Sequence, residues 1–194
     1  MITVSVDPVS LKEIEERLGS MRSKAPVLLK KSVNEAARQV LKEIKKDTRE
    51  KYILSVNDVN EKMILNGKAT TIRPRLYINI KGRPYNLLHF NVTPNSYDPK
   101  RKKVLKARVK RGETLKPLIN NGNKAFIGRF SNQYGKTDTI TVMQRKGKER
   151  FPIKKLRGPS MPIMAHTVWE DNENDYRQRL RQSVEKHIAE IMGG

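Results

Sequence analysis

The chain has 194 residues, 36% hydrophobic and 31% charged, and its 41 Lys and Arg against 20 Asp and Glu give a net charge of +21. The length predicts one domain spanning residues 1–194, and the charge predicts a polyanionic neighbour: nucleic acid, an anionic membrane or an acidic protein. The absence of cysteine excludes disulfides and thiolate metal sites. Because the chain shows no apolar run of about 18 residues and no signal-peptide pattern, we expect it in a cytoplasm or in a particle assembled there.

The N-terminal third predicts a short strand and two helices. Residues 2–6 alternate between apolar and hydroxyl side chains, which is strand periodicity. A first helix is expected over residues 8–18, with Asp7 as its cap and Gly19 as its stop. A longer helix should begin near Lys24, and its apolar stripe suits either a sheet or a neighbouring subunit, of which we favour the sheet.

The middle of the chain predicts shorter elements. A short helix is expected over residues 55–63 and a half-buried strand over residues 69–80, where Leu76, Ile78 and Ile80 alternate with polar residues. Residues 87–92 form a short apolar segment that should be buried. The proline-rich residues 93–99 indicate a loop.

The most basic run of the chain follows this loop. From Lys103 apolar and basic residues alternate, with Leu105, Ala107 and Val109 on one side, which predicts a strand over residues 103–111 that has a fully cationic face and ends at Gly112. This strand would lie inside a projecting basic loop or hairpin at residues 93–123. Between residues 100 and 157 there are nineteen Lys and Arg against three acids. The cluster has eight members, which are our candidates for contact with DNA or a partner protein: Lys100, Arg101, Lys102, Lys103, Lys106, Arg108, Lys110 and Arg111.

Charge alone suffices for phosphate contacts, which do not depend on sequence. Base recognition needs an insertable helix or stacking aromatics, and Tyr97 is the sole aromatic residue near the cluster. Sequence-specific recognition is therefore not expected. A solvated face, or contact with acidic surfaces of neighbouring subunits, explains the same charge equally well.

Residues 124–164 organise the second half of the chain. They predict two strands, over residues 125–130 and 137–145, a basic turn at 146–148, and a proline- and glycine-rich connection into a helix capped by Ser160. The rest of the chain predicts one helix, anchored through Trp169, Leu180, Val184 and Ile188. These elements predict an α+β fold with N-terminal helices, a mainly antiparallel sheet of four to six strands, and a C-terminal helix.

Catalysis has little support in the sequence. His89, His166 and His187 fall in separate predicted elements, and no metalloprotease or nucleophile-elbow motif is present. The acidic residues 170–175 suit a solvated helix face better than a metal site. We therefore expect no enzyme activity, no cofactor and no bound metal.

The motifs of residues 125–162 resemble the phage minor tail protein Z family, the tail-completion or neck proteins of long-tailed phages. The resemblance rests on a strand with Ala125, a strand that ends in the basic turn, and a segment that enters a helix. Its motif residues, with structural roles, are Phe126, Arg129, Pro152, Ile153, Leu156, Gly158, Pro159, Ser160 and Pro162.

The resemblance implies a single tail-completion or neck domain that acts as a structural virion protein. Members are expected to form a homo-oligomeric ring, sixfold, that completes the tail at its head-proximal end and helps to join it to the head. A sheet would close around the bore with helices outside it, and the genome would pass through or be held there. The partners would be other neck and tail proteins and, non-specifically, DNA, with no membrane; the protein would be in the host cytoplasm only during assembly.

A monomeric basic nucleic-acid-binding module, such as a ribosome-associated protein, is the alternative. It would stay a monomer with salt-sensitive affinity for free DNA or RNA, whereas a ring component should oligomerise or bind tail proteins. A small enzyme is a third hypothesis, which the missing catalytic set disfavours.

Overall fold

The computed structural model describes residues 2–5, 8–100, 103–131 and 138–193. These residues form two compact units. Residues 1–48, 56–82 and 161–194 make up the first, which we call the helical unit, and residues 49–55 and 83–160 make up the second, which we call the basic unit.

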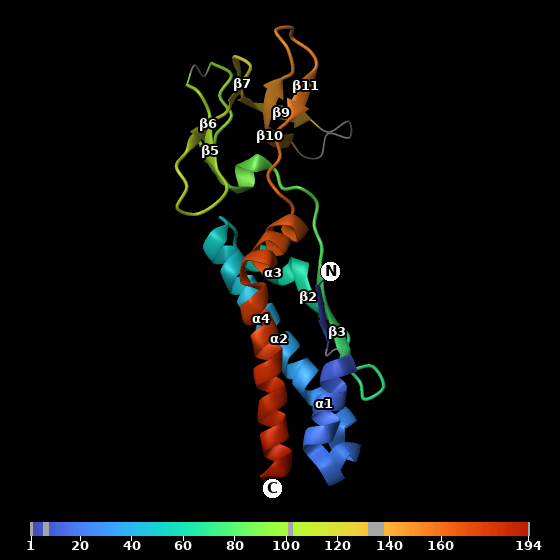
Figure 1. The fold of residues 1–194 in the computed structure, drawn as a ribbon. Helices are drawn as coiled ribbons and strands as arrows, with labels where there is room; N and C mark the ends of the chain where they lie inside the picture. Colours follow the sequence, from blue (N-terminus) through green and yellow to red (C-terminus); the bar gives the residue numbers. More distant parts are fainter. Residues whose placement is uncertain (1, 6–7, 101–102, 132–137, 194) are drawn as a thin grey trace. The chain divides into compact units, whose positions relative to one another are not determined.

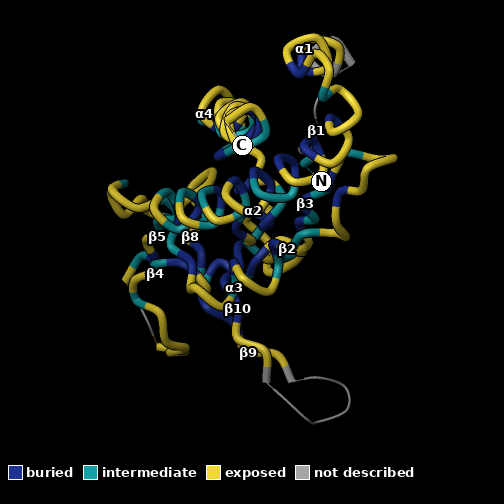
Figure 2. The backbone as a smooth tube through the Cα atoms, turned by 90° about the horizontal axis from the view of Figure 1, so that it is seen from below, coloured by how far each residue is buried: buried dark blue, intermediate teal, exposed yellow. Residues whose placement is uncertain are grey.

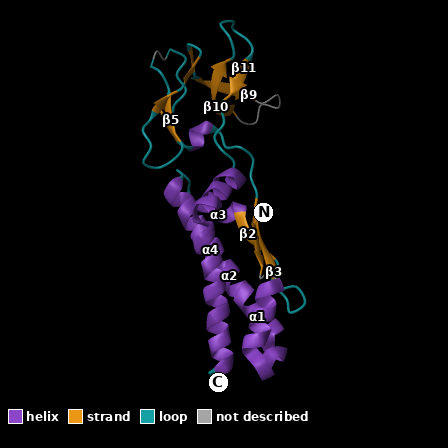
Figure 3. Cartoon of the chain, viewed as in Figure 1, coloured by secondary structure: helices purple, strands orange, loops and turns teal. Residues whose placement is uncertain are grey.

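The helical unit contains the three longest helices (Figures 1 and 3). Helix α1 spans Pro8–Leu18 and is followed by a 3-10 helix over Gly19–Lys24, then by α2 over Ala25–Lys51, whose last turn belongs to the basic unit. Gly19 has a φ of +51°, a conformation that glycine adopts without strain, so the predicted stop at this residue is confirmed. The predicted cap Asp7 lies outside the described residues.

One small antiparallel sheet belongs to this unit. Strand β3 (Arg75–Ile80) is central, with β1 (Ile2–Ser5) on one side and β2 (Met63–Asn66) on the other, and α3 (Val56–Lys62) leads into β2. The expected strand over residues 69–80 therefore begins only at Arg75. Strand β2 was not predicted, because Met63, Ile64 and Leu65 form a continuous apolar run with no period of two.

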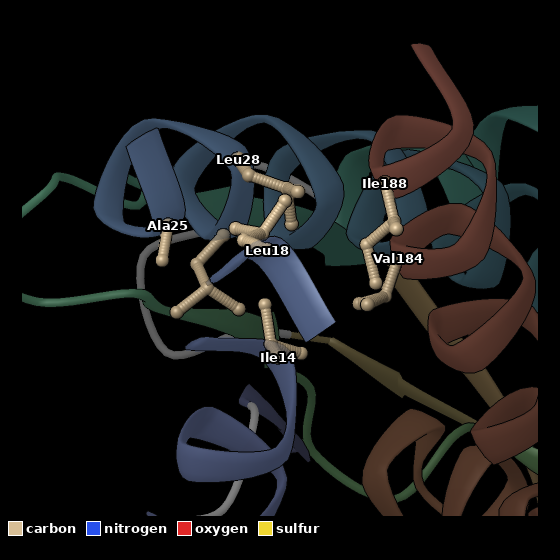
Figure 4. Packing of buried hydrophobic residues seen from close by; sticks show 7 residues of the cluster. Ile14, Leu18, Ala25, Leu28, Val184 and Ile188 are labelled. Atoms are coloured by element: carbon tan, nitrogen blue, oxygen red, sulfur yellow. The ribbon is translucent and has the colours of Figure 1, made fainter. Parts of the chain in front are cut away.

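Helices α1, α2 and α4 (Met161–Met192) share one apolar core. Figure 4 shows side chains of all three helices facing a common space, with Ile14 and Leu18 from α1, Leu28 from α2, and Val184 and Ile188 from α4. Leu180 is partly buried against the same cluster. The expected anchoring of the C-terminal helix is thus confirmed at Leu180, Val184 and Ile188, whereas Trp169 is half-buried and packs 5.3 Å from the Tyr176 ring.

Polar contacts fix how α4 lies along α2. Tyr176 donates a 2.6 Å hydrogen bond to Asp47 Oδ2, and burial together with this carboxylate raises the pKa of the Tyr176 hydroxyl. The Ser183 hydroxyl donates to the Ser32 carbonyl at 3.1 Å, and the buried His187 Nδ1 lies 2.7 Å from the Ser183 carbonyl oxygen and 3.1 Å from Ser32 Oγ. Because buried polar groups need partners, these bonds favour a single register of the two helices.

The basic unit consists of short strands and turns. Its longest sheet has the order β11–β10–β9, from Ile153–Lys155, Asp138–Arg145 and Phe126–Ser131. A second sheet has the order β4–β5–β6, from Asn91–Thr93, Lys106–Arg108 and Lys116–Pro117. Strands β7 (Ile119–Asn120) and β8 (Asn123–Lys124) form a hairpin, and a 3-10 helix spans Leu87–His89.

The α+β class is confirmed, but the strands of the described residues are divided among four small sheets rather than one sheet of four to six strands. Prolines and glycines explain the division, since Pro94, Pro99 and Pro117 cannot donate to a ladder and Gly112 and Gly122 adopt positive φ angles in turns. The two predicted strands of residues 125–145 are confirmed as β9 and β10. The predicted proline- and glycine-rich connection also contains β11.

Candidate interaction surface of the basic unit

Most of the chain's excess charge lies in the basic unit. Its 85 residues hold 22 Lys and Arg against 5 Asp and Glu, a net charge of +17, and leave only +4 for the helical unit. Burial is slight over much of this unit, and Figure 2 shows exposed stretches in the loop that follows β4. Much of this charge therefore faces solvent in the isolated chain.

The first half of the predicted cluster is exposed. Asp98 Oδ1 accepts a 2.9 Å hydrogen bond from the backbone of Lys100, which turns the chain at the start of the run. Lys100, Lys103 and Lys106 are exposed, while Arg101 and Lys102 lie outside the described residues. Lys106 stands in β5 between Thr93 and Pro117 of the neighbouring strands.

The second half of the cluster is built into the unit's own structure. Arg108 is half-buried, and its Nη1 donates to the Glu113 carbonyl at 3.3 Å. With its amide oxygen turned toward the guanidinium, the Asn91 side chain accepts from Arg108 Nε and Nη2 at 3.1 and 3.2 Å. Lys110 is half-buried and forms a β-bridge with Tyr52. Arg111 is exposed, but its Nε donates to the Arg49 carbonyl at 2.7 Å.

The apolar side of this strand is buried as the alternation predicts. Leu105 and Ala107 are buried, and Ala107 pairs with the buried Val92 of β4, whereas Val109 is half-buried. The predicted strand over residues 103–111 is shorter than expected, because only Lys106–Arg108 joins a ladder. The cationic face is therefore not uniformly exposed, since Lys106 is exposed whereas Arg108 and Lys110 are half-buried.

Arg108→Gln should lower the free energy of unfolding by about 1 kcal/mol, because it removes charge-assisted hydrogen bonds from a half-buried site. Lys106→Gln, its matched control on the same strand, should change it by about 0.5 kcal/mol or less. Denaturant unfolding of the two variants beside wild type measures the difference. Equal stability of the two would show that the Arg108 contacts contribute nothing to the fold.

A second basic group lies on the turn from β10 to β11. Lys146, Lys148 and Arg150 are exposed there, next to Phe151, whose side chain is 66% exposed. The Arg150 guanidinium lies 5.8 Å from the Phe151 ring centroid, and Lys155 Nζ lies 5.0 Å from that of Phe130. A cation placed over the face of an aromatic ring is attracted to the ring.

The exposure of the two phenylalanines is not predicted from the sequence. Phe151 could have been found from its place between Arg150 and Pro152, in a basic turn. No periodicity predicts that Phe130, at the end of β9, stays 40% exposed.

Several family-motif residues take part in hydrogen bonds or close packing within the fold. The Leu156 backbone donates to the Val142 carbonyl at 2.8 Å, and the Gly158 backbone donates to the Tyr85 carbonyl at 2.9 Å. A Cβ atom on Gly158 would come within 2.2 Å of Phe90 Cε2. Ser160 is buried directly before α4, at the predicted cap position.

The three histidines have different neighbours, and the structure does not bring them together as one cluster. His89 stacks on Tyr85 with ring centroids 4.5 Å apart, His166 lies 3.2 Å from Glu170, and His187 belongs to the α2–α4 contact. Among the residues that the structure describes, no group of three or more His, Asp or Glu could hold a metal ion. Within that same part of the chain, no helix is long and apolar enough to cross a membrane.

The basic unit thus presents a charged surface with exposed lysines and two exposed phenylalanines. The chain matches the family model of prophage minor tail protein Z (GPZ) over residues 10–192, and it belongs to this family of phage minor tail proteins. The resemblance of the second-half motifs is thereby confirmed and extends to the N-terminal helices. Membership places the chain among the structural proteins of the phage tail. Neither the curated proteins nor the solved structures include a match to this chain.

Proposed function

We propose that copies of this chain form a ring, sixfold, at the head-proximal end of the phage tail, where the ring completes the tail and helps to join it to the head. Membership in a minor tail protein family supports a place in the tail. The ring, the junction with other neck proteins and the contact with DNA are the further steps of the proposal. Closed cyclic assemblies are the usual form of homo-oligomers, which favours a ring over an open array.

The concentration of +17 in the basic unit is the observation that carries the DNA contact. Duplex DNA carries one negative charge per about 1.7 Å of its axis, so a surface with exposed Lys100, Lys103 and Lys106 suits a phosphate backbone. The described helices of the basic unit are one 3-10 turn and the end of α2, and neither offers a helix that could enter a major groove. Non-specific contact with a genome in a bore fits these features.

Size measurement and imaging test the assembly. Native mass spectrometry of the purified chain, alone and with the tail tube of its phage, should show a closed oligomer, and electron microscopy of particles that carry a labelled copy should place the label at the head-proximal tail end. A chain that remains monomeric, is absent from particles and binds free DNA or RNA would favour the alternative nucleic-acid-binding module.

Replacing the three exposed lysines, with Lys100→Gln, Lys103→Gln and Lys106→Gln in one variant, should weaken DNA binding without unfolding the chain. Each phosphate contact that is lost should reduce the slope of log K against log salt by about 0.9, so the slope should fall by up to about 3. Fluorescence anisotropy with duplexes of unrelated sequence measures the slope. Particles that carry the variant should retain less DNA or join fewer heads.

The matched control is Lys30→Gln, Lys31→Gln and Lys42→Gln, three exposed lysines of α2 in the helical unit. It removes the same net charge as the test variant. Because these lysines lie outside the basic unit, the salt slope and the particles should stay near wild type. Equal loss in both variants would show that net charge alone governs binding. A strong preference for one DNA sequence would contradict the structural role.

A further inference from the structure

The loop between β2 and β3 presents one aliphatic side chain almost entirely to solvent. Residues 67–74 connect the two strands, and within the helical unit this loop projects beyond the strand ends (Figure 1). Ile72 lies near its tip and is 89% exposed, more than any other large hydrophobic residue among those that the structure describes. Single exposed apolar residues are common and need no explanation, but this one is held in a defined position by the hydrogen bonds of its loop.

The base of the loop is clamped to α2. Asn34 Nδ2 donates to the Ala69 carbonyl at 3.0 Å, and the Ala69 backbone donates to Asn34 Oδ1 at 3.1 Å. The side-chain amide thus forms the pair of hydrogen bonds that a neighbouring strand would form. Ala69 itself is buried. The loop therefore leaves the sheet from a fixed point.

The tip of the loop is closed by its own hydrogen bonds. The Thr70 backbone donates to the Arg73 carbonyl at 3.0 Å, and the Arg73 backbone donates to Thr70 Oγ1 at 3.0 Å. The Arg75 backbone also donates to the Arg73 carbonyl, at 2.8 Å. Ile72 stands inside this closed turn, so binding a partner would cost little ordering entropy.

The surroundings of Ile72 are cationic. Lys68, Arg73 and Arg75, in or next to the loop in sequence, are exposed, and no Asp or Glu occurs anywhere in residues 62–97. A phosphate backbone would pair with these cations but would offer nothing apolar to cover the isoleucine. A surface rich in Asp and Glu complements such a loop, and this chain, with 20 Asp and Glu against 41 Lys and Arg, supplies one less readily than an acidic protein does.

We propose that this loop is a docking knob, in which Ile72 inserts into an apolar socket rimmed by Asp and Glu on a different, acidic protein of the same tail. The proposal rests on the proposed tail role and adds a partner class and a contact residue to it. The preformed turn supplies the geometry, the isoleucine supplies apolar contact area, and the three cations supply charge complementarity.

Site-directed photo-crosslinking in assembled particles tests the contact. The full-length chain, with Ile72→p-benzoylphenylalanine, replaces the natural copy in its phage, and irradiated particles are analysed by mass spectrometry. We expect one crosslinked peptide, from a different tail protein, that contains apolar residues together with Asp or Glu. The same crosslinker at the exposed Val27 of α2 is the control and should not reach that peptide.

The outcomes separate the two proposals. If the chain is absent from purified particles, both the tail role and the docking knob are overturned. If it is present and position 72 crosslinks to nothing, to another copy of the chain or to DNA, the docking knob alone is overturned.

Truncating the knob gives an independent readout. Ile72→Ser should melt like wild type, because its side chain is exposed, yet the number of copies per particle under limiting expression should fall at least about tenfold, the loss expected for an aliphatic side chain that leaves a socket. Ile72→Val should restore most of the incorporation. Wild-type incorporation of the Ile72→Ser chain would overturn the proposal.

Discussion

Ile188→Asp is expected to unfold the helical unit. Ile188 is 2% exposed in the core that α1, α2 and α4 share, so its loss removes about 1.5–3 kcal/mol of apolar burial. A carboxylate in its place would be buried among Ile14, Leu18, Leu28 and Val184 without a partner, which costs several kcal/mol more. The total, about 5 kcal/mol or more, equals the whole stability of many domains. Thermal melts followed by the helical circular dichroism signal measure it.

Ala189→Asp is the matched control, since it places the same new charge one residue further along α4 at an exposed position. Its cost should be only the helix propensity difference, below about 1 kcal/mol. Leu180→Asp, at the half-buried edge of the same core, should fall between the two. If Ile188→Asp and Ala189→Asp melt at the same temperature, the core shown in Figure 4 does not hold α4 in place.

The helices were predictable because each carries a long apolar stripe and recognisable ends. Gly19 is an example, since a glycine after Leu18 predicts an end that its positive φ then provides. Strand β2 was not predictable from its four residues, since the partner that makes it a strand, β3, lies nine residues further on in sequence. Short strands owe their existence to pairing, which local sequence does not encode.

The sequence predicted which residues make up the candidate surface, but not which of them are exposed and which are bonded into the fold. The alternation from Leu105 to Val109 correctly places Leu105 and Ala107 inside, yet it treats Lys106 and Arg108 as equivalent. Their difference arises from Asn91 and the Glu113 carbonyl, which only the fold brings to Arg108. A glutamine variant intended to probe surface charge should therefore spare Arg108.

The family-motif glycine, Gly158, is needed for space rather than for its backbone angles. Its φ lies outside the positive region, so alanine could adopt the same backbone. The obstacle is the buried ring of Phe90, because an added Cβ would lie 2.2 Å from Cε2 and 2.8 Å from Cδ2. The ring has little room to move away, since Tyr85 and His89 pack edge-on against it at 5.9 and 5.8 Å between centroids.

Gly158→Ala should accordingly destabilise the basic unit by about 1–3 kcal/mol, the usual cost of overpacking a closed site. Gly147→Ala is the control, because nothing lies within 4 Å of the Cβ that it adds, and it should stay within about 0.5 kcal/mol of wild type. Amide hydrogen exchange of β10 reports on this unit specifically. Phe90→Leu removes the ring, so adding Gly158→Ala to it should cost much less than in the wild-type background, with a coupling of about 0.5–3 kcal/mol. Strictly additive effects would mean that the glycine does not owe its place to Phe90.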